Sequence, residues 1–155
     1  MSQWLGFTNQ KLYQARLLLD QRGRANAPAA LNQALEQSAL YQLYDAYVSY
    51  LNELADIAGH RQPVDSLESL LAATPLVIGE MTEIRVLRQD SFSWLTAFLS
   101  AVAAQAQPVT VAPVQIQEPA GNLIASVRDT SDDARDWWQA LSDLIDSQRQ
   151  NRRES

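Results

Sequence analysis

The residues of this 155-residue sequence that are best suited to bind a ligand are a series of tyrosines, together with Arg16 and Glu36. Tyr41, Tyr44, Tyr47 and Tyr50 follow one another at three-residue intervals in a run without proline or glycine. Each helical residue turns the chain by about 100°, so the four rings spiral across roughly half of the circumference. This spread predicts a central helix that packs against neighbours on more than one side.

The C-terminal half of this helix has one polar arc, and the rest of its surface is apolar or tyrosine. The polar residues of the arc are Gln42, Asp45, Ser49, Asn52, Glu53 and Asp56. Tyr41 and Tyr50 stand at the edges of the apolar arc, where their hydroxyls can remain in water, whereas Tyr44 and Tyr47 need buried partners.

Before Leu40 the pattern reverses. Leu31 and Leu35 project on the side that later becomes polar, while Glu36 and Gln37 project on the later core side. Two explanations fit this reversal: the helix bends near Ser38, or its first turns pack against different partners from its last turns.

An antiparallel hairpin of the first two helices predicts where these polar residues meet. If the chain turns near Ala25, contacting residues have numbers that sum to about 51, and Arg16 faces Glu36. We expect a partly buried salt bridge between them, with two interpretations: an ion pair that sets the helix register, or a pocket in which Arg16 binds an anionic group and tyrosines hold its apolar part. The candidate ligand or interaction cluster is Lys11, Tyr13, Arg16, Glu36, Gln37, Tyr41 and Tyr44.

Other chemistry finds little support in the sequence. There is no cysteine, and the single histidine, His60, cannot supply the Glu-x-x-His pairs of a di-iron bundle. Carboxylates gather at Glu80 with Glu83 and again at 132–136, but acids in the first turn of a helix are common and are usually solvated. We therefore expect no catalytic residue, no metal site and no cofactor, which favours a protein that is not an enzyme.

Composition narrows the class of protein. With 46% hydrophobic and 19% charged residues, the chain is expected to fold as one globular domain. A net charge of -6 disfavours binding to nucleic acid. No stretch approaches the ~18 apolar residues of a membrane span, and no signal peptide is visible. A cytoplasmic location is the expectation.

Helical periodicity and cap residues predict the elements. Helices are expected at about 9–24, 26–58, 66–73, 74–88, 90–105 and 131–150. Asn26, Asp65 with Glu68, Thr74 and Asp90 are the predicted caps, and Phe92 begins the apolar stripe of the fifth helix. The fold class is all-α: a mainly antiparallel bundle of five to six helices, with its core at about 9–106. Residues 107–129 form a proline-containing extended strap before the last helix, or alternatively a free tether.

Three sequence segments carry a resemblance: TNQKLY at 8–13, EQSALYQLY at 36–44 and SWL at 93–95. Together they resemble an uncharacterised family of small bacterial all-helical proteins over most of the chain up to Val102. The resemblance implies that Asn9, Lys11, Tyr13, Glu36 and Tyr44 share one surface of the first two helices. It carries no function.

The expected function is that of a cytoplasmic interaction protein, an adaptor or regulator with an unidentified protein partner and with self-association as a further expectation. The alternative is a small-ligand or enzymatic site between helices one and two. A pocket at the cluster would favour the alternative, and tight packing there with an exposed apolar patch elsewhere would favour the adaptor.

Overall fold

The computed structural model describes residues 2–24, 26–108 and 130–155, and these form an all-α bundle without strands. The described helices are α1 (Gln3–Gln21), α2 (Ala29–Ile57), α3 (Leu67–Ala73), α4 (Gly79–Gln89), α5 (Trp94–Gln105) and α7 (Thr130–Glu154). The expected fold class is confirmed. From residue 109 onward the predicted strap lies outside the described residues.

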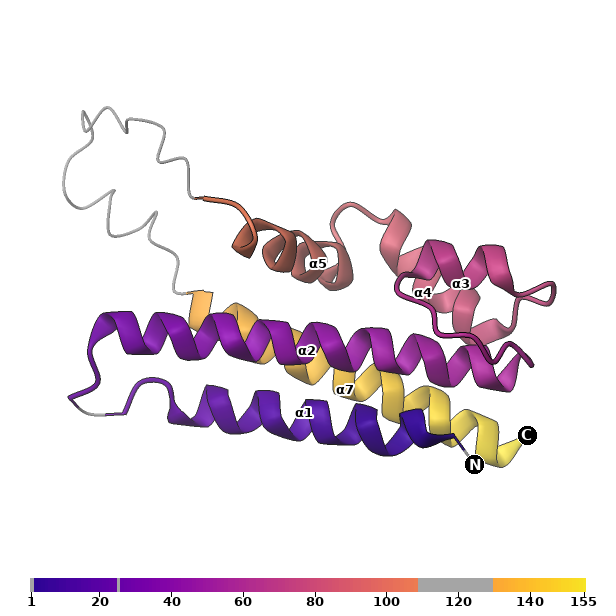
Figure 1. The fold of residues 1–155 in the computed structure, drawn as a ribbon, viewed down its shortest axis with the longest axis horizontal. Helices are drawn as coiled ribbons and strands as arrows, with labels where there is room; N and C mark the ends of the chain where they lie inside the picture. Colours follow the sequence, from indigo (N-terminus) through magenta and orange to yellow (C-terminus); the bar gives the residue numbers. More distant parts are fainter. Residues whose placement is uncertain (1, 25, 109–129) are drawn as a thin grey trace.

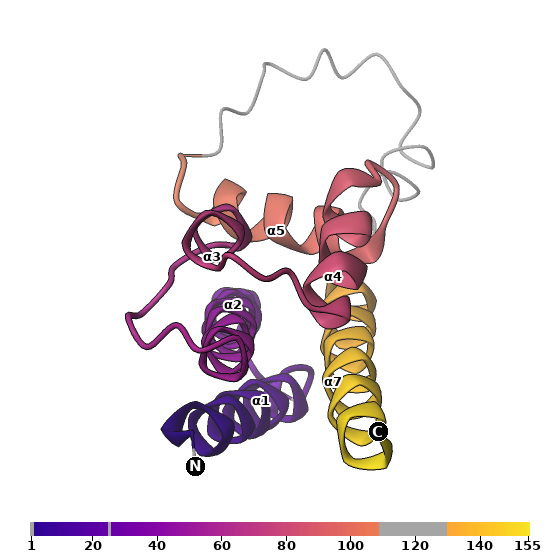
Figure 2. The ribbon, with the colours of Figure 1, turned by 90° about the vertical axis from the view of Figure 1, so that its right-hand side faces the viewer.

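Three long helices run side by side along the molecule (Figure 1). α1 and α2 form an antiparallel hairpin, and α7 runs in the same direction as α2, so both chain ends lie at one end of the bundle. In the end view, α2 lies between α1 on one side and α3 and α5 on the other (Figure 2). Because α2 contacts α1, α3, α5 and α7, the prediction of a central helix is confirmed.

The first two helices differ from their predicted bounds for local reasons. α1 begins at Gln3 because the side chain of Ser2 caps it by accepting a hydrogen bond from the Trp4 amide. The prediction of Asn26 as the cap of α2 is wrong: Asn26 adopts a φ of +71° in the connection, and Pro28 precedes the first helical residue. The predicted end is confirmed, since α2 stops at Ile57 and Gly59 has a φ of +84°.

The short helices also begin later than predicted. The capping box consists of Ser66 and Ser69 rather than Asp65 and Glu68. The predicted start of α4 at Thr74 is wrong, because the Thr74 amide and hydroxyl both bond to the Leu70 carbonyl and complete α3 instead. α4 therefore starts at Gly79.

Ser93, and not Asp90, caps α5 by accepting a hydrogen bond from the Thr96 amide. Phe92 consequently lies outside the helix. Its side chain is 97% exposed, so its predicted place in the apolar stripe is wrong.

The core forms around the C-terminal half of α2. Its largest fully buried side chains include Tyr50, Leu51, Leu54, Phe98, Leu141 and Ile145. Tyr47 is buried as predicted, whereas Tyr44 is half-buried and Tyr41 exposed. The prediction of a solvent-edge position for Tyr50 is wrong, because α7 covers that side of α2.

Half of the polar arc of α2 is buried as well, while Asp45 in the same arc is exposed. Ser49, Asn52 and Glu53 are all buried, each bonded to a different segment of the chain. The Asn52 amide nitrogen donates to the Val64 carbonyl at 2.9 Å, and its amide oxygen accepts from the Val64 amide at 2.8 Å. This pair of bonds fixes the loop before α3 against α2.

The first turns of α2 contact two other helices. The Glu36 carboxylate pairs with Arg22 at the end of α1, and the Gln37 carbonyl accepts a hydrogen bond from Gln105 of α5. Asn32 accepts a hydrogen bond from the Gly23 amide. These contacts come from the end of α1 and from α5, both of which also pack against the C-terminal half of α2.

Candidate functional site

The salt bridge predicted between Arg16 and Glu36 is absent. Both residues are described, and Arg16 instead lies 3.9 Å from Asp20, while Glu36 lies 3.8 Å from Arg22. The hairpin register explains the error. In the observed hairpin, the numbers of contacting residues add to between 56 and 58 rather than to about 51. The contacting pairs are Thr8 with Ser49, Lys11 with Asp45, and Arg22 with Glu36. The turn thus lies nearer Pro28 than Ala25, and every expected contact shifts by about six residues.

The predicted cluster is consequently spread along the hairpin. Lys11 forms an ion pair with Asp45 at 3.3 Å and lies over the Phe7 ring. Tyr13 is 56% exposed, and the Arg16 guanidinium lies 5.9 Å from the centre of its ring. Tyr41 is exposed.

Gln37 contributes a backbone carbonyl to its contact with α5, and Tyr44 packs against Tyr47 with 6.3 Å between ring centroids. Within the described part of the chain, Tyr13 contacts Arg16, whereas Arg16 and Tyr44 line separate cavities.

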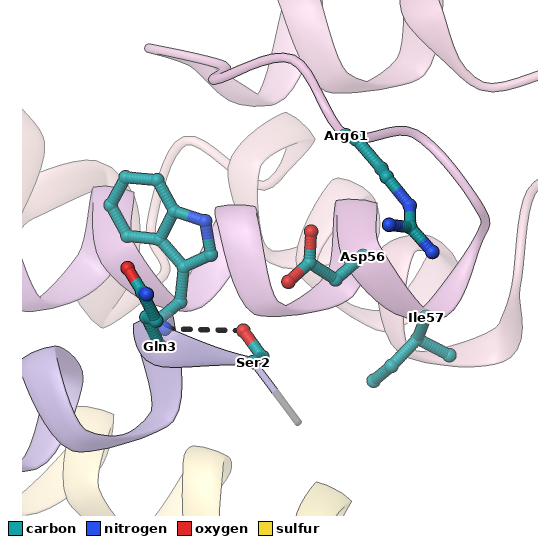
Figure 3. Close-up of a pocket in the computed structure, with 6 residues that line it drawn as sticks. Ser2, Gln3, Asp56, Ile57 and Arg61 are labelled. Atoms are coloured by element: carbon teal, nitrogen blue, oxygen red, sulfur yellow. Dashed lines mark hydrogen bonds between the residues drawn. The ribbon is translucent and has the colours of Figure 1, made fainter.

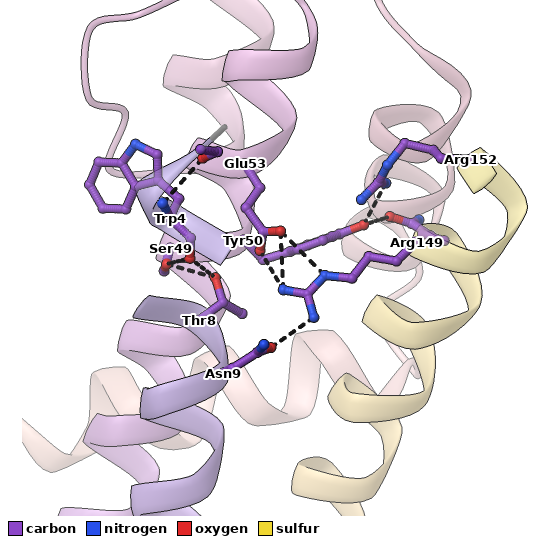
Figure 4. A network of polar contacts seen from close by, with 10 residues as sticks. Trp4, Thr8, Asn9, Ser49, Tyr50, Glu53, Arg149 and Arg152 are labelled. Atoms are coloured by element: carbon purple, nitrogen blue, oxygen red, sulfur yellow. Dashed lines mark hydrogen bonds and ion pairs between the residues drawn. The ribbon is translucent and has the colours of Figure 1, made fainter. Parts of the chain in front are cut away.

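The most extensive buried polar network instead joins α1, α2 and α7 (Figure 4). The Arg149 guanidinium donates to both carboxylate oxygens of Glu53, at 3.1 and 2.9 Å from Nη2, and its Nη1 donates to Asn9 at 2.8 Å. Both side chains are nearly inaccessible. With its donors occupied in this way, Arg149 is held as a structural cross-link between helices.

Tyr50 extends this network towards α4. Its hydroxyl donates to the Gln148 side chain at 2.6 Å and accepts from Arg152 at 3.1 Å, and the guanidinium groups of Arg149 and Arg152 each lie 5.9 Å from its ring centre. Burial raises the pKa of Tyr50 to about 12, although the hydrogen bond from Arg152 lowers it. Gln148 in turn donates to Glu83.

The sequence contained one signal of this network. The apolar stripe of α7, which includes Leu144 and Ile145, continues one turn later as Gln148 and Arg149. Polar residues that continue an apolar stripe are expected to be buried and paired. Their partners could not be identified from the sequence, because Glu53 is 96 residues from Arg149.

Two open cavities lie on the other side of α2, where the start of α1 meets the loop after α2. The larger, about 580 Å³, is lined by Ser2, Gln3, Trp4, Asp56, Ile57 and Arg61 (Figure 3). The second, about 330 Å³, shares Trp4 with it and is here called the aromatic groove. Its lining is Trp4, Phe7, Tyr44, Asp45, Val48, Ser49, Asn52, Pro63, Val64 and Asp65.

Local contacts give the aromatic groove a rigid floor. The Thr8 and Ser49 hydroxyl oxygens lie 2.7 Å apart, and they lie 2.8 and 3.1 Å from the Trp4 carbonyl oxygen. One hydroxyl donates to the other, and the second donates to the carbonyl, which holds α1 close to α2. The rings of Trp4 and Phe7 meet edge to face at 6.1 Å. Trp4 and Phe7 therefore belong to α1 and line a groove, rather than preceding the helix as predicted.

A third cavity, about 240 Å³, lies between α2, α3 and α5 and is here called the tyrosine pocket. It is lined by Tyr44, Tyr47, Ser66, Leu67, Glu68, Arg88, Leu99, Val102 and Ala103. Burial raises the pKa of Tyr47; the Glu68 carboxylate raises it further, and Arg88 lowers it. Two rungs of the tyrosine series thus face a cavity, on a different side of α2 from the predicted one.

Among the side chains that the structure describes, in 2–24, 26–108 and 133–155, no three acidic or histidine residues gather in a way that could hold a metal ion. Over the same residues, no helix combines the length and the apolar character needed to cross a membrane.

A family model matches the chain over residues 1–155, and the chain belongs to that family, a family of unknown function (DUF6586). The resemblance to an uncharacterised family is confirmed, and it extends beyond Val102 to include α7. No curated protein and no solved structure matches the chain.

Proposed function

We propose that this member of an uncharacterised family is a cytoplasmic, non-enzymatic helical interaction protein, an adaptor or regulator that binds a partner protein in the aromatic groove. The observation that carries the proposal is the open apolar lining of the groove. Trp4, Phe7 and Tyr44 come together there from two helices, and Phe7 is 41% exposed. Aromatic side chains in a concave surface are typical anchors of protein–protein contacts.

The charge of the groove favours a basic partner. Asp45 and Asp65 are its charged lining residues, and Asp45 is already paired with Lys11. Asp65 is exposed and forms no ion pair among the described residues. The whole chain carries a net charge of -6, which adds long-range attraction. The partner we propose is a protein segment with apolar side chains for the floor and lysine or arginine beside them for Asp65.

Site-specific photocrosslinking in living cells tests this proposal. The photoreactive amino acid p-benzoylphenylalanine replaces Phe7 in the groove or, as a matched control, the exposed Tyr13 of the same helix. We expect a crosslink from position 7, and not from position 13, to a segment that combines apolar and basic residues. Identical products at both positions, or no protein captured at position 7, would contradict the proposal.

Charge reversal then tests the stated chemistry of the partner. Asp65→Lys should weaken binding of the captured segment about tenfold, since it replaces an attraction at the contact with a repulsion. Asp146→Lys on α7 makes the same change in net charge at an exposed position outside the groove and should have a smaller effect. Equal effects of the two variants would show that net charge alone, and not the groove, attracts the partner.

A further inference from the structure

Tyr47 is a buried residue whose hydroxyl has no hydrogen-bond partner in the described part of the chain. The residue is 3% exposed overall, but its hydroxyl oxygen is not among the buried unpaired polar atoms, so water in the cavity reaches it. A ligand that displaces this water would have to replace its hydrogen bond to the hydroxyl. Tyr47 also lines the tyrosine pocket, so a molecule inside that pocket would have a phenol to bond with.

Two opposite charges line the same cavity without neutralising each other. Arg88 comes from the last turn of α4 and Glu68 from the first turn of α3. Neither side chain forms an ion pair among the described residues, and both are exposed. A guanidinium presents a fork of donors that matches a carboxylate, and a carboxylate accepts hydrogen bonds from an ammonium group.

The remaining lining is apolar. Leu67, Leu99 and Val102 come from α3 and α5, and the Tyr44 ring closes one side. The volume of about 240 Å³ equals that of about eight water molecules at ~30 Å³ each. A cavity of this size accommodates a small molecule.

We infer that the tyrosine pocket binds a small zwitterion with an apolar body, the chemistry of an apolar amino acid. The carboxylate of the ligand bonds to Arg88 and the Tyr47 hydroxyl, its ammonium group lies at Glu68, and its side chain packs on Leu99 and Val102. Each polar group of the pocket that lacks a partner in the free protein then acquires one.

Calorimetric titration of the purified full chain tests this inference with matched probes. L-leucine and L-phenylalanine carry all three features, 4-methylpentanoate lacks the ammonium group of leucine, and 3-methylbutylamine lacks its carboxylate. We expect one of the two amino acids to bind with a Kd between about 1 µM and 1 mM, and the truncated probes of leucine to bind at least about tenfold more weakly than leucine. Absence of binding by both amino acids up to about 10 mM would overturn the inference.

Variants separate a binding role of Tyr47 from a structural one. Tyr47→Phe removes only the hydroxyl, so we expect an unchanged or higher unfolding temperature together with amino-acid binding that is about tenfold weaker. Tyr13→Phe, at an exposed position, should change neither quantity. A lower unfolding temperature for Tyr47→Phe with an unchanged Kd would show that the hydroxyl is structural and the inference wrong.

Charge variants test the assigned orientation of the ligand. Arg88→Gln should weaken the binding of leucine more than the binding of 3-methylbutylamine, which has no carboxylate. Glu68→Gln should weaken the binding of leucine more than the binding of 4-methylpentanoate, which has no ammonium group. The opposite preferences would contradict the assignment. None of these variants lines the aromatic groove, so the partner proposal and the ligand inference can fail independently.

Discussion

The buried ion pair of Glu53 and Arg149 allows the change in the free energy of unfolding to be predicted for variants at both positions. Replacing Arg149 with methionine keeps much of the side-chain length but leaves the Glu53 carboxylate buried without its cation. Replacing Glu53 with methionine leaves the guanidinium of Arg149 in the same position. The double variant removes both charges and leaves an apolar contact between α2 and α7.

The magnitude follows from the geometry of the pair. Three hydrogen bonds of 2.9–3.3 Å join the two side chains. Unit charges about 4 Å apart attract by about 4 kcal/mol at an effective dielectric of ~20. Breaking a buried pair from one side costs about 3–5 kcal/mol, whereas replacing both partners with apolar residues is often close to neutral. Each single variant should therefore lose about 3–5 kcal/mol, and the double variant about 1 kcal/mol.

Urea unfolding of the four proteins, followed by far-ultraviolet circular dichroism, measures these differences. With these losses, the expected coupling energy of the cycle is about 5–9 kcal/mol. The ion pair of Lys11 and Asp45 serves as a control, because Asp45 is half exposed and such surface pairs contribute about 1 kcal/mol or less. If the losses from Glu53 and Arg149 simply add, with coupling below about 0.5 kcal/mol, the buried cross-link does not stabilise the fold as argued.

Three further predictions concern single elements of the structure. Because the pKa values of Tyr47 and Tyr50 are raised, both phenols keep their protons in the folded state above the ordinary pKa of 10.0. Their contribution to the free energy of unfolding is therefore fully present below pH 10 and is lost as the pH rises towards 12 and beyond. Urea unfolding should show about 3 kcal/mol less stability at pH 11 than at pH 9. This difference should be smaller in the variants Tyr47→Phe and Tyr50→Phe, each of which lacks one of the two phenols. Asn52→Ala should cost about 2–4 kcal/mol in the same assay, because it leaves the buried amide and carbonyl of Val64 without partners; an effect below 1 kcal/mol would show that water replaces the side chain. Phe92→Ser should change stability by less than about 0.5 kcal/mol, since the ring is almost fully exposed, and a change in sedimentation coefficient would reveal self-association through this residue.

The site illustrates how far prediction from the sequence extends. Periodicity along α2 correctly indicated a helix with neighbours on several sides and a buried Tyr47. Periodicity misplaced Tyr50, because a tyrosine at the edge of an apolar arc is expected to keep its hydroxyl in water unless a distant partner is known. The buried partners of Tyr50 are Gln148 and Arg152, from a helix about a hundred residues away.

The hairpin shows the same limit at shorter range. Both helices were predicted, yet the register was about six residues in error, since the cap of α2 was placed at Asn26 rather than Pro28. A small error in the turn moves every cross-helix contact by a fixed amount. This error explains why a salt bridge between Arg16 and Glu36 was predicted, although Arg16 pairs with Asp20 and Glu36 with Arg22.

Local sequence features are enough to predict the all-helical class, the approximate positions of the helices and the end of α2 just before Gly59. These properties depend on the spacing of apolar residues and on cap residues within a few positions. The hairpin register, the burial of Glu53 with Arg149 and the cavities that involve Tyr44 and Tyr47 were known only from the folded arrangement. Burial and pairing arise where surfaces come into contact, and segments far apart in the chain form those surfaces only after folding.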